Sequence, residues 1–430
     1  MDNGNDKPME TRVYYGEYTL RHWLNLILSK NIDLPEYQRS FVWEEEDVKR
    51  MMESLKSGQF IMPVTIAHYQ DEDGSKNLIL DGQQRLTSLL LAYLGYMPIK
   101  EKFKASEDDI AHGDDSCEEE QGSTMEWTYK NLLKENPQEN RFESIKDRLM
   151  KDEHYKLMSL NFDGNKDEFY NKMFLGFSFI IPCSTEASET QRYFSTLFRN
   201  MNYLGKKLSP LESRRSLYFM NKDYKNYFDG KLENNDDVLC GIRIVENMQP
   251  RKIDFVRYLS LLSQYLVVKN RDVTRVMVGY SAYSSRESFY ADYVSYILQM
   301  EQESRKDKFN GFDMKRVFPK QEWIERFRLV HSFLERNMRR LGLDEKFHKS
   351  FSSWIDADYW LFGLLYYVVF EGKNIVREQG LVEEMRGEIY KKRRQRENGI
   401  LTEYQRNPNR LGNLRERMAR SMEIYNRHAE

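Results

Sequence analysis

The sequence predicts an α+β protein in which a mixed N-terminal domain, residues 17–239, precedes an all-helical domain, residues 240–430. The chain has 430 residues, which is too many for one ordinary hydrophobic core. Strand-like runs and helical segments are interspersed in the first half, whereas long segments with helical spacing of apolar residues follow. Residues 1–16 are polar, and we expect them to form a flexible terminus.

Local signals define the elements of the N-terminal domain in order. EYTLRHWLNLILSK, residues 17–30, has helical spacing of its apolar residues, and Pro35 then favours extended geometry in IDLPEYQRSFVW. EEEDVKRMMESLKSG is a predicted helix that ends at Gly58. PVTIAHY and LILD are predicted strands, and RLTSLLLAYLG is a predicted helix that ends at Gly95.

Composition divides the rest of the chain. EDDIAHGDDSCEEEQGS is acidic and poor in apolar residues, which predicts an exposed insertion near residues 101–165. GFSFIIP, residues 176–182, is strand-like, and ETQRYFSTLFRNMN is a predicted helix. After residue 240, four segments have the length and apolar content of packed helices: IDFVRYLSLLSQYLV, FYADYVSYILQM, EWIERFRLVHSFLERNM and YWLFGLLYYVVFEG.

Charge and cysteine content restrict the class of protein. The chain has 66 Lys and Arg against 68 Asp and Glu, so its net charge of −2 gives no general attraction to nucleic acid or membrane. Cys117, Cys183 and Cys240 lie far apart without a C-x-x-C pair, which excludes a zinc ribbon and is typical of a reducing cytoplasm. The most apolar stretch, Trp360 to Phe370, is shorter than the roughly 20 residues that span a bilayer. We expect a cytoplasmic protein with no membrane partner.

The first candidate site is D-G-Q-Q-R, Asp81 to Arg85, where a predicted strand meets a helix. Gly82 lets the backbone approach a ligand closely, and the N–H groups of the following helix attract phosphate. Arg85 offers a planar cation to phosphate oxygens, and Asp81 could hold Mg²⁺ or orient an attacking water. Residue types alone favour a simpler interpretation, in which Asp81 caps the helix and Arg85 forms an ion pair. The sequence has no P-loop motif.

Two further segments carry candidate binding residues. PEYQRSFVW combines a rigid extended backbone with aromatic side chains and a cation that could contact a base or phosphate, although Phe41 and Trp43 are expected in the core. Lys206, Lys207, Arg214 and Arg215 concentrate positive charge at a helix start, which suits an anion. Ser209 and Glu212 have capping-box spacing around Pro210, a local role that needs no ligand.

The combination of LPEYQRSFVW, a helix, a strand and LILDGQQRLTSLLLAYL resembles the N-terminal domain of GmrSD-type, modification-dependent restriction enzymes, which is related to the ParB and sulfiredoxin fold. YFSTLFRNMNYLGKKLSPLESRRSLYF is similar to a later block of that family. The resemblance covers about residues 17 to 220, interrupted by the acidic insertion.

The resemblance implies a ParB/sulfiredoxin-like domain that binds and hydrolyses a nucleoside triphosphate, GTP, ATP or CTP, with Mg²⁺. It assigns catalysis to Asp81, Gln83, Gln84 and Arg85, with Asp81 as the metal ligand. The implied nucleotide-binding residues are Tyr37, Gln38, Arg39, Gly82, Arg85, Thr87, Lys206, Glu212 and Arg215.

Many relatives also carry an HNH nuclease domain, which needs metal-binding and general-base histidines. The seven histidines of this chain show no such arrangement, so we expect no HNH domain and assign any DNA cleavage to a separate partner nuclease. The basic cluster from Lys391 to Arg396, with Arg406, Arg410, Arg415, Arg417 and Arg420, could contact DNA phosphates. Interleaved acidic residues favour a solvated helix instead.

The main hypothesis is therefore a nucleotide-hydrolysing regulator in a bacterial anti-phage or restriction system. The sequence is compatible with a homodimer. A second hypothesis is a non-catalytic, nucleotide-switched DNA-binding or adaptor module. A third is a nuclease whose active site the motifs do not reveal.

Overall fold

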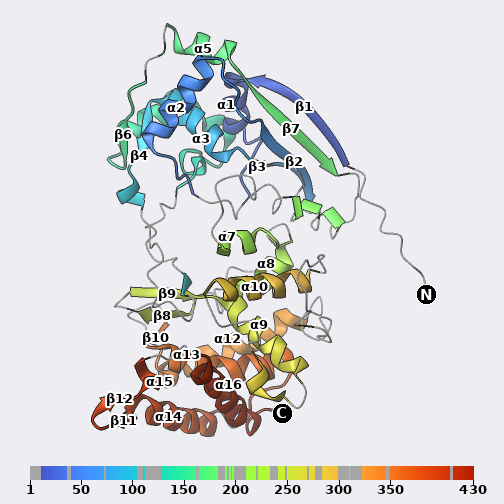
Figure 1. Ribbon diagram of the computed structural model, residues 1–430, viewed down its shortest axis with the longest axis vertical. Coiled ribbons are helices and arrows are strands. Elements are labelled where there is room, and N and C mark those ends of the chain that lie inside the picture. Colours follow the sequence, from blue (N-terminus) through green and yellow to red (C-terminus); the bar gives the residue numbers. More distant parts are fainter. Residues whose placement is uncertain are drawn as a thin grey trace, which may run out of the picture. The chain divides into compact units, whose positions relative to one another are not determined.

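The computed structural model folds into two compact units, the first formed by residues 1–106 and 121–219 and the second by residues 107–120 and 220–430 (Figure 1). The residues that the structure describes are 11–35, 40–71, 74–103, 110–111, 127–160, 162, 164–182, 189–190, 193–194, 196–197, 210–218, 221–232, 241–246, 249–268, 271–276, 283–298, 309, 322–343, 349–406 and 410–430.

Unit 1 is built on a four-stranded sheet in the order β1-β7-β2-β3. Strand β7 is antiparallel to β1 and parallel to β2, which is antiparallel to β3. The bounds are β1 Thr11–Thr19, β7 Phe174–Pro182, β2 Val64–Asp71 and β3 Gly74–Asp81. The predicted strands at 63–69, 78–81 and 176–182 are thereby confirmed.

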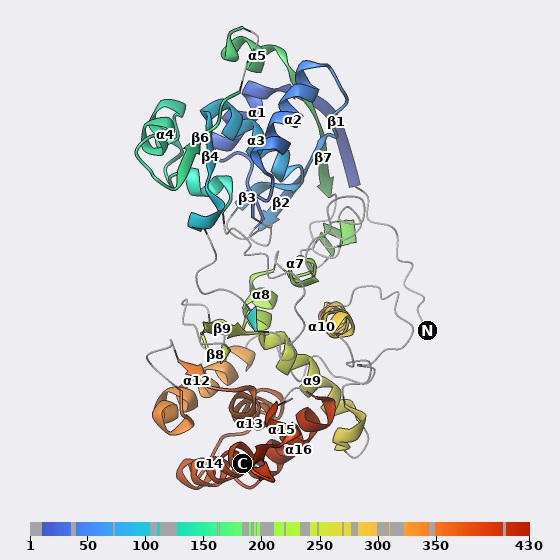
Figure 2. The same ribbon diagram turned by 60° about the vertical axis from the view of Figure 1, so that its left-hand side comes forward.

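Helices cover one face of this sheet (Figure 2). Their bounds are α1 Leu20–Leu28, α2 Glu45–Lys56 and α3 Gln83–Leu94, which confirms the three helices expected between residues 17 and 95. Trp23 of α1 is fully buried and its indole N–H donates to Leu175 O at 3.0 Å, which fastens the helix to β7. Val64, Ile66 and Leu175 belong to the same apolar core as the helices.

Residues 11–16 form the first part of β1 and are not a flexible terminus. The segment TRVYYGEYT pairs with β7 along its whole length, from Thr11 opposite Pro182 to Thr19 opposite Phe174. Aromatic residues favour such a strand. The partner strand lies about 160 residues further along the chain, so local sequence signals do not reveal the pairing.

The region expected to be an exposed insertion contributes to the core of unit 1 from Trp127 onward. Trp127, Tyr129 and Ile145 are buried, and Phe41 N–H donates to Trp127 O at 2.7 Å. The elements here are β4 Tyr96–Pro98, η1 Lys100–Phe103, η2 Tyr129–Leu132, η3 Pro137–Glu139, α4 Phe142–Leu149, β6 Tyr155–Leu157 and α5 Lys166–Lys172. Strand β5, Ile110–Ala111, instead pairs with a strand of unit 2.

Gly82 connects β3 to α3 in a single residue. Its φ of +99° lies in the left-handed region that favours glycine. A Cβ built on Gly82 would lie 2.9 Å from Cγ2 of Val64, so the position has no room for a side chain. The first helical hydrogen bond runs from Leu86 N–H to Gly82 O at 2.9 Å. The close contact with β2 fixes the start of α3 against the sheet.

Unit 2 is mostly helical, in agreement with the prediction for the C-terminal region, but it is not all-helical. Strands β8 Arg243–Glu246 and β9 Gln249–Ile253 form a hairpin in a sheet of order β10-β8-β9-β5, with β10 at Ser350–Phe351. The helices are α8 Lys222–Asp229, α9 Phe255–Val267, η5 Val273–Arg275, α10 Tyr283–Ile297, α12 Glu322–Leu341, α13 Trp354–Leu365 with a π-helical extension Tyr366–Phe370, α14 Glu378–Arg394, α15 Glu403–Arg406 and α16 Leu411–Asn426. A small hairpin, β11 Arg396–Glu397 and β12 Ile400–Leu401, follows α14.

The second unit begins at residue 220, ahead of the expected boundary at 240, because α8 packs with the later helices. The ring of Tyr227 stacks on Phe327 of α12 at 5.8 Å between centroids, and Phe228 meets Tyr293 of α10 at 6.1 Å. Both α8 aromatic residues are buried. The core of unit 2 thus includes a segment that the sequence assigned to the N-terminal domain.

A buried ion cluster lies among α9, α13 and α16. Asp358 accepts from both terminal nitrogens of Arg257, at 2.7 and 3.0 Å, and from Arg417 at 2.9 Å, and all three side chains are at most 1% exposed. Burial alone would raise the pKa of Asp358, but the attraction of the two guanidinium groups outweighs it and lowers the pKa. The carboxylate therefore stays ionised and offsets part of the charge of the two cations.

Helix α13 is buried on all sides, as expected of a helix at the centre of a core. Gly363 permits α16 to approach closely, since a Cβ there would lie 2.1 Å from the ring of Tyr425. Its N–H donates to Ser421 Oγ at 2.8 Å. In the part of the chain that the structure describes, no helix combines the length and apolar character needed to cross a bilayer.

Replacing Gly82 with alanine is expected to lower the free energy of unfolding of unit 1 by about 2–5 kcal/mol, because backbone strain adds to the overlap with Val64. Urea denaturation followed by tryptophan fluorescence measures the loss. Gly164→Ala is the matched control, since Gly164 has a φ of +123° but open space at its Cβ position. Equal losses in the two variants would show that the Val64 contact is unimportant.

Replacing Asp358 with asparagine is expected to cost about 3–5 kcal/mol in unfolding free energy, because it leaves Arg257 and Arg417 buried without their counter-ion. Thermal or urea unfolding of the full chain measures it. Glu322→Gln is the control, since it removes an exposed ion pair with Arg326 and should cost no more than about 1 kcal/mol. A loss for Asp358→Asn as small as that of the control would contradict the role of the cluster.

Candidate functional site

The candidate site lies at the β3–α3 junction, where Asp81 and Arg85 stand on opposite sides of Gly82. Arg85 Nη2 donates to Asp81 Oδ2, so the two side chains form an ion pair across the turn. The Asp81 side chain is 46% exposed, whereas that of Arg85 is only 12% exposed. The carboxylate therefore meets solvent while the guanidinium group is largely enclosed.

Two backbone carbonyls fix the other side of the Arg85 guanidinium group. Its Nη1 donates to Met62 O and, at 3.3 Å, to Pro63 O, immediately before β2. Arg85 thus joins the end of β3, the start of α3 and the approach to β2. A guanidinium group held in this way presents a fixed positive charge at the junction.

Gln84 binds the segment that carries the Y-Q-R strip. Its Oε1 accepts from Val42 N–H at 2.9 Å, and its Nε2 donates to Ser40 O at 3.1 Å. The amide therefore pairs with two backbone groups as a neighbouring strand would. Gln84 holds residues 40–42 against the start of α3 and uses both amide atoms in doing so.

Gln83 and Thr87, the other two expected site residues on α3, are buried at 6% and 0% exposure. Among the described residues, Thr87 Oγ and the neighbouring Ser88 Oγ have no hydrogen-bond partner. As a glycine, Gly82 provides no side chain to cap α3, and the first turn begins without a capping side chain. The N-terminus of α3 therefore keeps the partial positive charge that favours an anion.

The structure unites only part of the expected set of residues. Asp81, Gly82, Gln83, Gln84, Arg85 and Thr87 share one strand-to-helix junction. Arg215 is the last residue of a different helix, α7, Pro210–Arg215. Tyr37, Gln38, Arg39 and Lys206 lie outside the described residues, as does the Glu212 side chain.

Asp81 carries the one carboxylate of the D-G-Q-Q-R motif that could bind a metal ion. Among the described residues, no group of three or more His, Cys, Asp or Glu side chains could hold a metal ion. Mg²⁺ commonly binds one or two protein carboxylates and completes its shell with water and phosphate oxygens. The half-exposed Asp81 fits such a role if nucleotide phosphates and water supply the other ligands.

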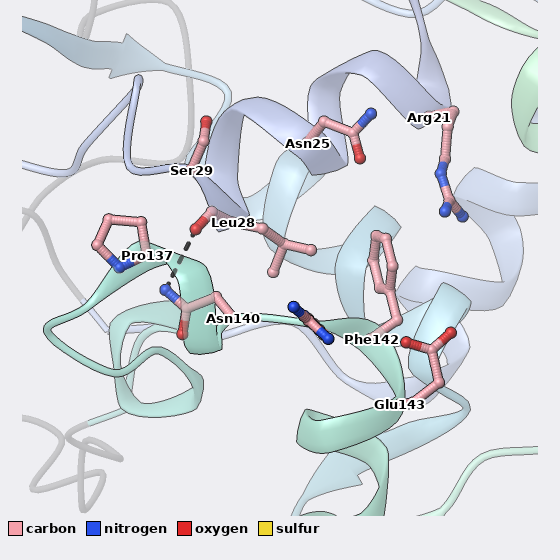
Figure 3. Close-up of a pocket in the computed structure, with 9 residues that line it drawn as sticks. Arg21, Asn25, Leu28, Ser29, Pro137, Asn140, Phe142 and Glu143 are labelled. Carbon is pink, nitrogen blue, oxygen red and sulfur yellow. Dashed lines mark hydrogen bonds between the residues drawn. The ribbon is translucent and has the colours of Figure 1, made fainter.

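A depression of about 330 Å³ in unit 1 lies elsewhere, between α1 and residues 137–143 (Figure 3). Its polar groups serve the fold. Asn140 donates to Leu28 O at 3.2 Å and accepts from Lys134 N–H at 2.8 Å, and the Arg21 guanidinium group lies 4.5 Å from the centre of the Phe142 ring. None of its lining residues belongs to the candidate site, so we do not assign this depression to nucleotide binding.

Several cations of the C-terminal basic cluster take part in contacts within unit 2. Lys392 pairs with Glu416, and Arg393 pairs with Asp356 at 2.5 Å. Arg415 donates to Val276 O, and Arg417 belongs to the buried Asp358 cluster. These contacts give part of the cluster a structural role, and DNA binding by the remainder stays a prediction.

Sequence reasoning missed the groups that hold the motif in place. Ser40, Val42, Met62 and Pro63 act through their backbones, so residue type gives no signal for them. Sequence reasoning also missed Thr65, whose Cα lies opposite that of Asp81. The alternation of PVTIAHY could have placed Thr65 on the face opposite Val64 and Ile66.

Comparison with known proteins agrees with the extent of unit 1. Residues 20–219 match the family model described as the GmrSD restriction endonuclease, N-terminal domain. The chain is also similar to an uncharacterised protein of Methanocaldococcus jannaschii, with 25% identity over 300 residues, covering 57% of this chain and 48% of that protein. The chain thus spans about half the length of that curated relative.

No solved structure matches the chain, and the ParB/sulfiredoxin-like fold stays a prediction. The family match begins at the first residue of α1 and ends at residue 219, where unit 1 ends. Over residues 20–219, the chain is similar to the N-terminal domain of the GmrSD restriction endonucleases.

Proposed function

We propose that unit 1 binds a nucleoside triphosphate at the β3–α3 junction and hydrolyses it, and that this event regulates DNA recognition or a partner nuclease in a restriction system. The observation that carries the proposal is the arrangement of Asp81 and Arg85 around Gly82 at an uncapped helix start. The restriction role rests on the family match over residues 20–219.

The phosphates would bind where two sources of positive potential meet. The first turn of α3 contributes its N–H groups and the positive end of the helix dipole. Arg85 contributes a guanidinium group that the carbonyls of Met62 and Pro63 already hold in position. Since its remaining hydrogen bond goes to the half-exposed Asp81, a phosphate oxygen can bind beside or in place of that carboxylate.

Asp81 would carry the hydrolytic step. Its carboxylate could accept a proton from an attacking water or hold Mg²⁺, which neutralises phosphate charge when bound. Gln84 is less suited to orient water, since Ser40 and Val42 occupy both atoms of its amide. These two hydrogen bonds argue against Gln84 as a catalytic residue. They support the second candidate function, a nucleotide-switched adaptor that binds the nucleotide without hydrolysing it.

We assign any nuclease activity to a partner nuclease, in line with the histidine pattern of the sequence. The segment 40–42, held by Gln84, would transmit nucleotide binding, because it ends the strip that the family resemblance places beside the nucleotide.

Replacing Arg85 with lysine is expected to weaken nucleoside triphosphate binding about 10- to 100-fold, because a point charge replaces the planar fork while the net charge is kept. Replacing Asp81 with asparagine is expected to lower the rate of phosphate release about 100-fold or more if Asp81 orients water. Calorimetric titration with ATP, GTP and CTP in Mg²⁺ and a phosphate-release assay measure the two effects.

Lys172→Ala is the control, since it removes an exposed (i, i+4) ion pair with Glu168 in the same unit and should leave both measurements unchanged. Thermal unfolding of each variant shows whether unit 1 is intact. Failure of the wild-type chain to bind any nucleoside triphosphate would overturn the proposal. Binding without phosphate release would exclude the hydrolase and leave the adaptor.

Replacing Gln84 with alanine is expected to speed amide hydrogen exchange at Val42 and to cost about 1–3 kcal/mol in unfolding free energy, since Val42 N–H and Ser40 O lose their partner. Hydrogen-exchange mass spectrometry over residues 40–43 measures the change. Gln59→Ala, at an exposed position, is the control. Unchanged exchange at Val42 would contradict a positioning role for Gln84.

A further inference from the structure

The acidic residues that alternate in sequence with the cations of α14 form ion pairs with α16. Glu384 pairs with Arg427, and Glu388 lies 3.5 Å from Arg420. The side chain of Glu388 is only 13% exposed. These carboxylates offset cations of the neighbouring helix and leave the charge at the basic end of α14 uncompensated.

Three cations at this end of α14 are exposed: Lys391, Arg394 and Arg396, the last in β11. Among the described residues, none of the three has a carboxylate partner. The other two cations of the last turn, Lys392 and Arg393, do form ion pairs within unit 2. The basic cluster thus divides into a part that stabilises the fold and a part that faces solvent.

Two of the exposed cations share one face of α14 with a glycine and a tyrosine. Gly387, Tyr390, Lys391 and Arg394 are spaced by three or four residues, so they are neighbours on the helix surface. We call these four residues the basic stripe; Glu383, one turn earlier, marks its end. Tyr390 is 55% exposed, and the Arg394 guanidinium group lies 4.4 Å from the centre of its ring, which holds the cation in place.

Gly387 has no packing role within the described residues. It lies in the interior of α14, where glycine is less favourable than alanine. A Cβ built on it would have no atom within 4 Å, whereas a Cβ on Gly363 would overlap with Tyr425. Stabilisation of the helix dipole accounts for cations in a last turn but gives no reason for this glycine. An exposed glycine lets a large ligand approach the helix backbone closely.

The length and rigidity of the basic stripe fit a regular polyanion. Seven residues separate its ends, which is roughly 10 Å along a helix. Duplex DNA carries one phosphate for about every 1.7 Å of its axis, so a surface of this length meets several phosphates. Arg396 extends the line of cations into the β11–β12 hairpin, which follows α14 (Figure 1) and in which its Nη1 donates to Gly399 O at 3.3 Å.

We propose that the basic stripe, together with Arg396, binds the sugar–phosphate backbone of duplex DNA. Lys391, Arg394 and Arg396 bind phosphate oxygens, and Gly387 admits the DNA backbone close to α14. Contacts of this kind position a protein on DNA without reading its sequence. The assignment goes beyond the proposed function, because it gives unit 2 a DNA-binding surface that needs no nucleotide in unit 1.

The test measures binding of the full chain to a fluorescein-labelled DNA duplex by fluorescence anisotropy, without nucleotide, between about 50 and 200 mM salt. The double variant Lys391→Ala/Arg394→Ala is expected to bind about 10- to 100-fold more weakly at the lower salt. The slope of log affinity against log salt should fall by about 2, because two phosphate contacts are lost. Arg328→Ala/Arg340→Ala, which removes two exposed cations of α12, is the matched control and should keep the wild-type slope.

Replacing Gly387 with glutamine separates binding from stability. Glutamine favours a helix more than glycine does, so the midpoint of thermal unfolding should rise. DNA binding should weaken about 10-fold, which corresponds to the loss of roughly one phosphate contact. Unchanged DNA affinity in this variant would overturn the close approach at Gly387.

Two results would overturn the assignment as a whole. One is a wild-type chain that does not bind the duplex, or a Lys391→Ala/Arg394→Ala variant with the same affinity and salt slope as the control. The other is displacement of the duplex by polyglutamate as effectively as by unlabelled DNA, which would show a surface for any polyanion. Because the assay contains no nucleotide, neither result bears on nucleotide binding by unit 1.

Discussion

The geometry of the candidate site depends on the single residue that separates strand from helix. Gly82 adopts a left-handed backbone and packs against Val64 with no space for a side chain. The chain therefore turns from β3 into α3 without a loop. This places Arg85, the fifth residue of the motif, beside Asp81, the first. This is why Arg85 reaches both Asp81 and the carbonyls before β2. A longer connection would leave these groups on a mobile loop.

Residues of the motif also hold the protein together. The side-chain amide of Gln84 gives residues 40–42 the backbone hydrogen bonds that a neighbouring strand would give. Arg85 links three segments of the chain. A ligand that competes for Asp81 or Arg85 would therefore act on contacts that join β3, the start of α3 and the approach to β2.

Sequence reasoning succeeded where structure is determined locally and failed where it depends on distant partners. The elements from residue 63 to Gly95 follow from apolar periodicity and glycine signals. Strand β1 was missed because it needs β7, and the core role of Trp127 was missed because it needs Phe41. The simpler expectation from residue types was that Asp81 caps the helix and that Arg85 pairs with an acidic neighbour. The structure confirms the ion pair, with Asp81 as the partner, but α3 begins at Gly82 without a side-chain cap, and nucleotide binding there stays a prediction.

The chain passes between its two units three times, after residues 106, 120 and 219. The stretch 107–120 leaves the first unit, adds β5 to the sheet of the second and returns. A single recombination event therefore cannot exchange either unit as an intact module, because one break would separate β5 from β9. Proteolytic cleavage after residue 219 would leave β5 on the fragment that carries unit 1 and separate it covalently from residues 220–430. Exchange of the second unit as an intact module would therefore require residues 107–120 to move together with residues 220–430.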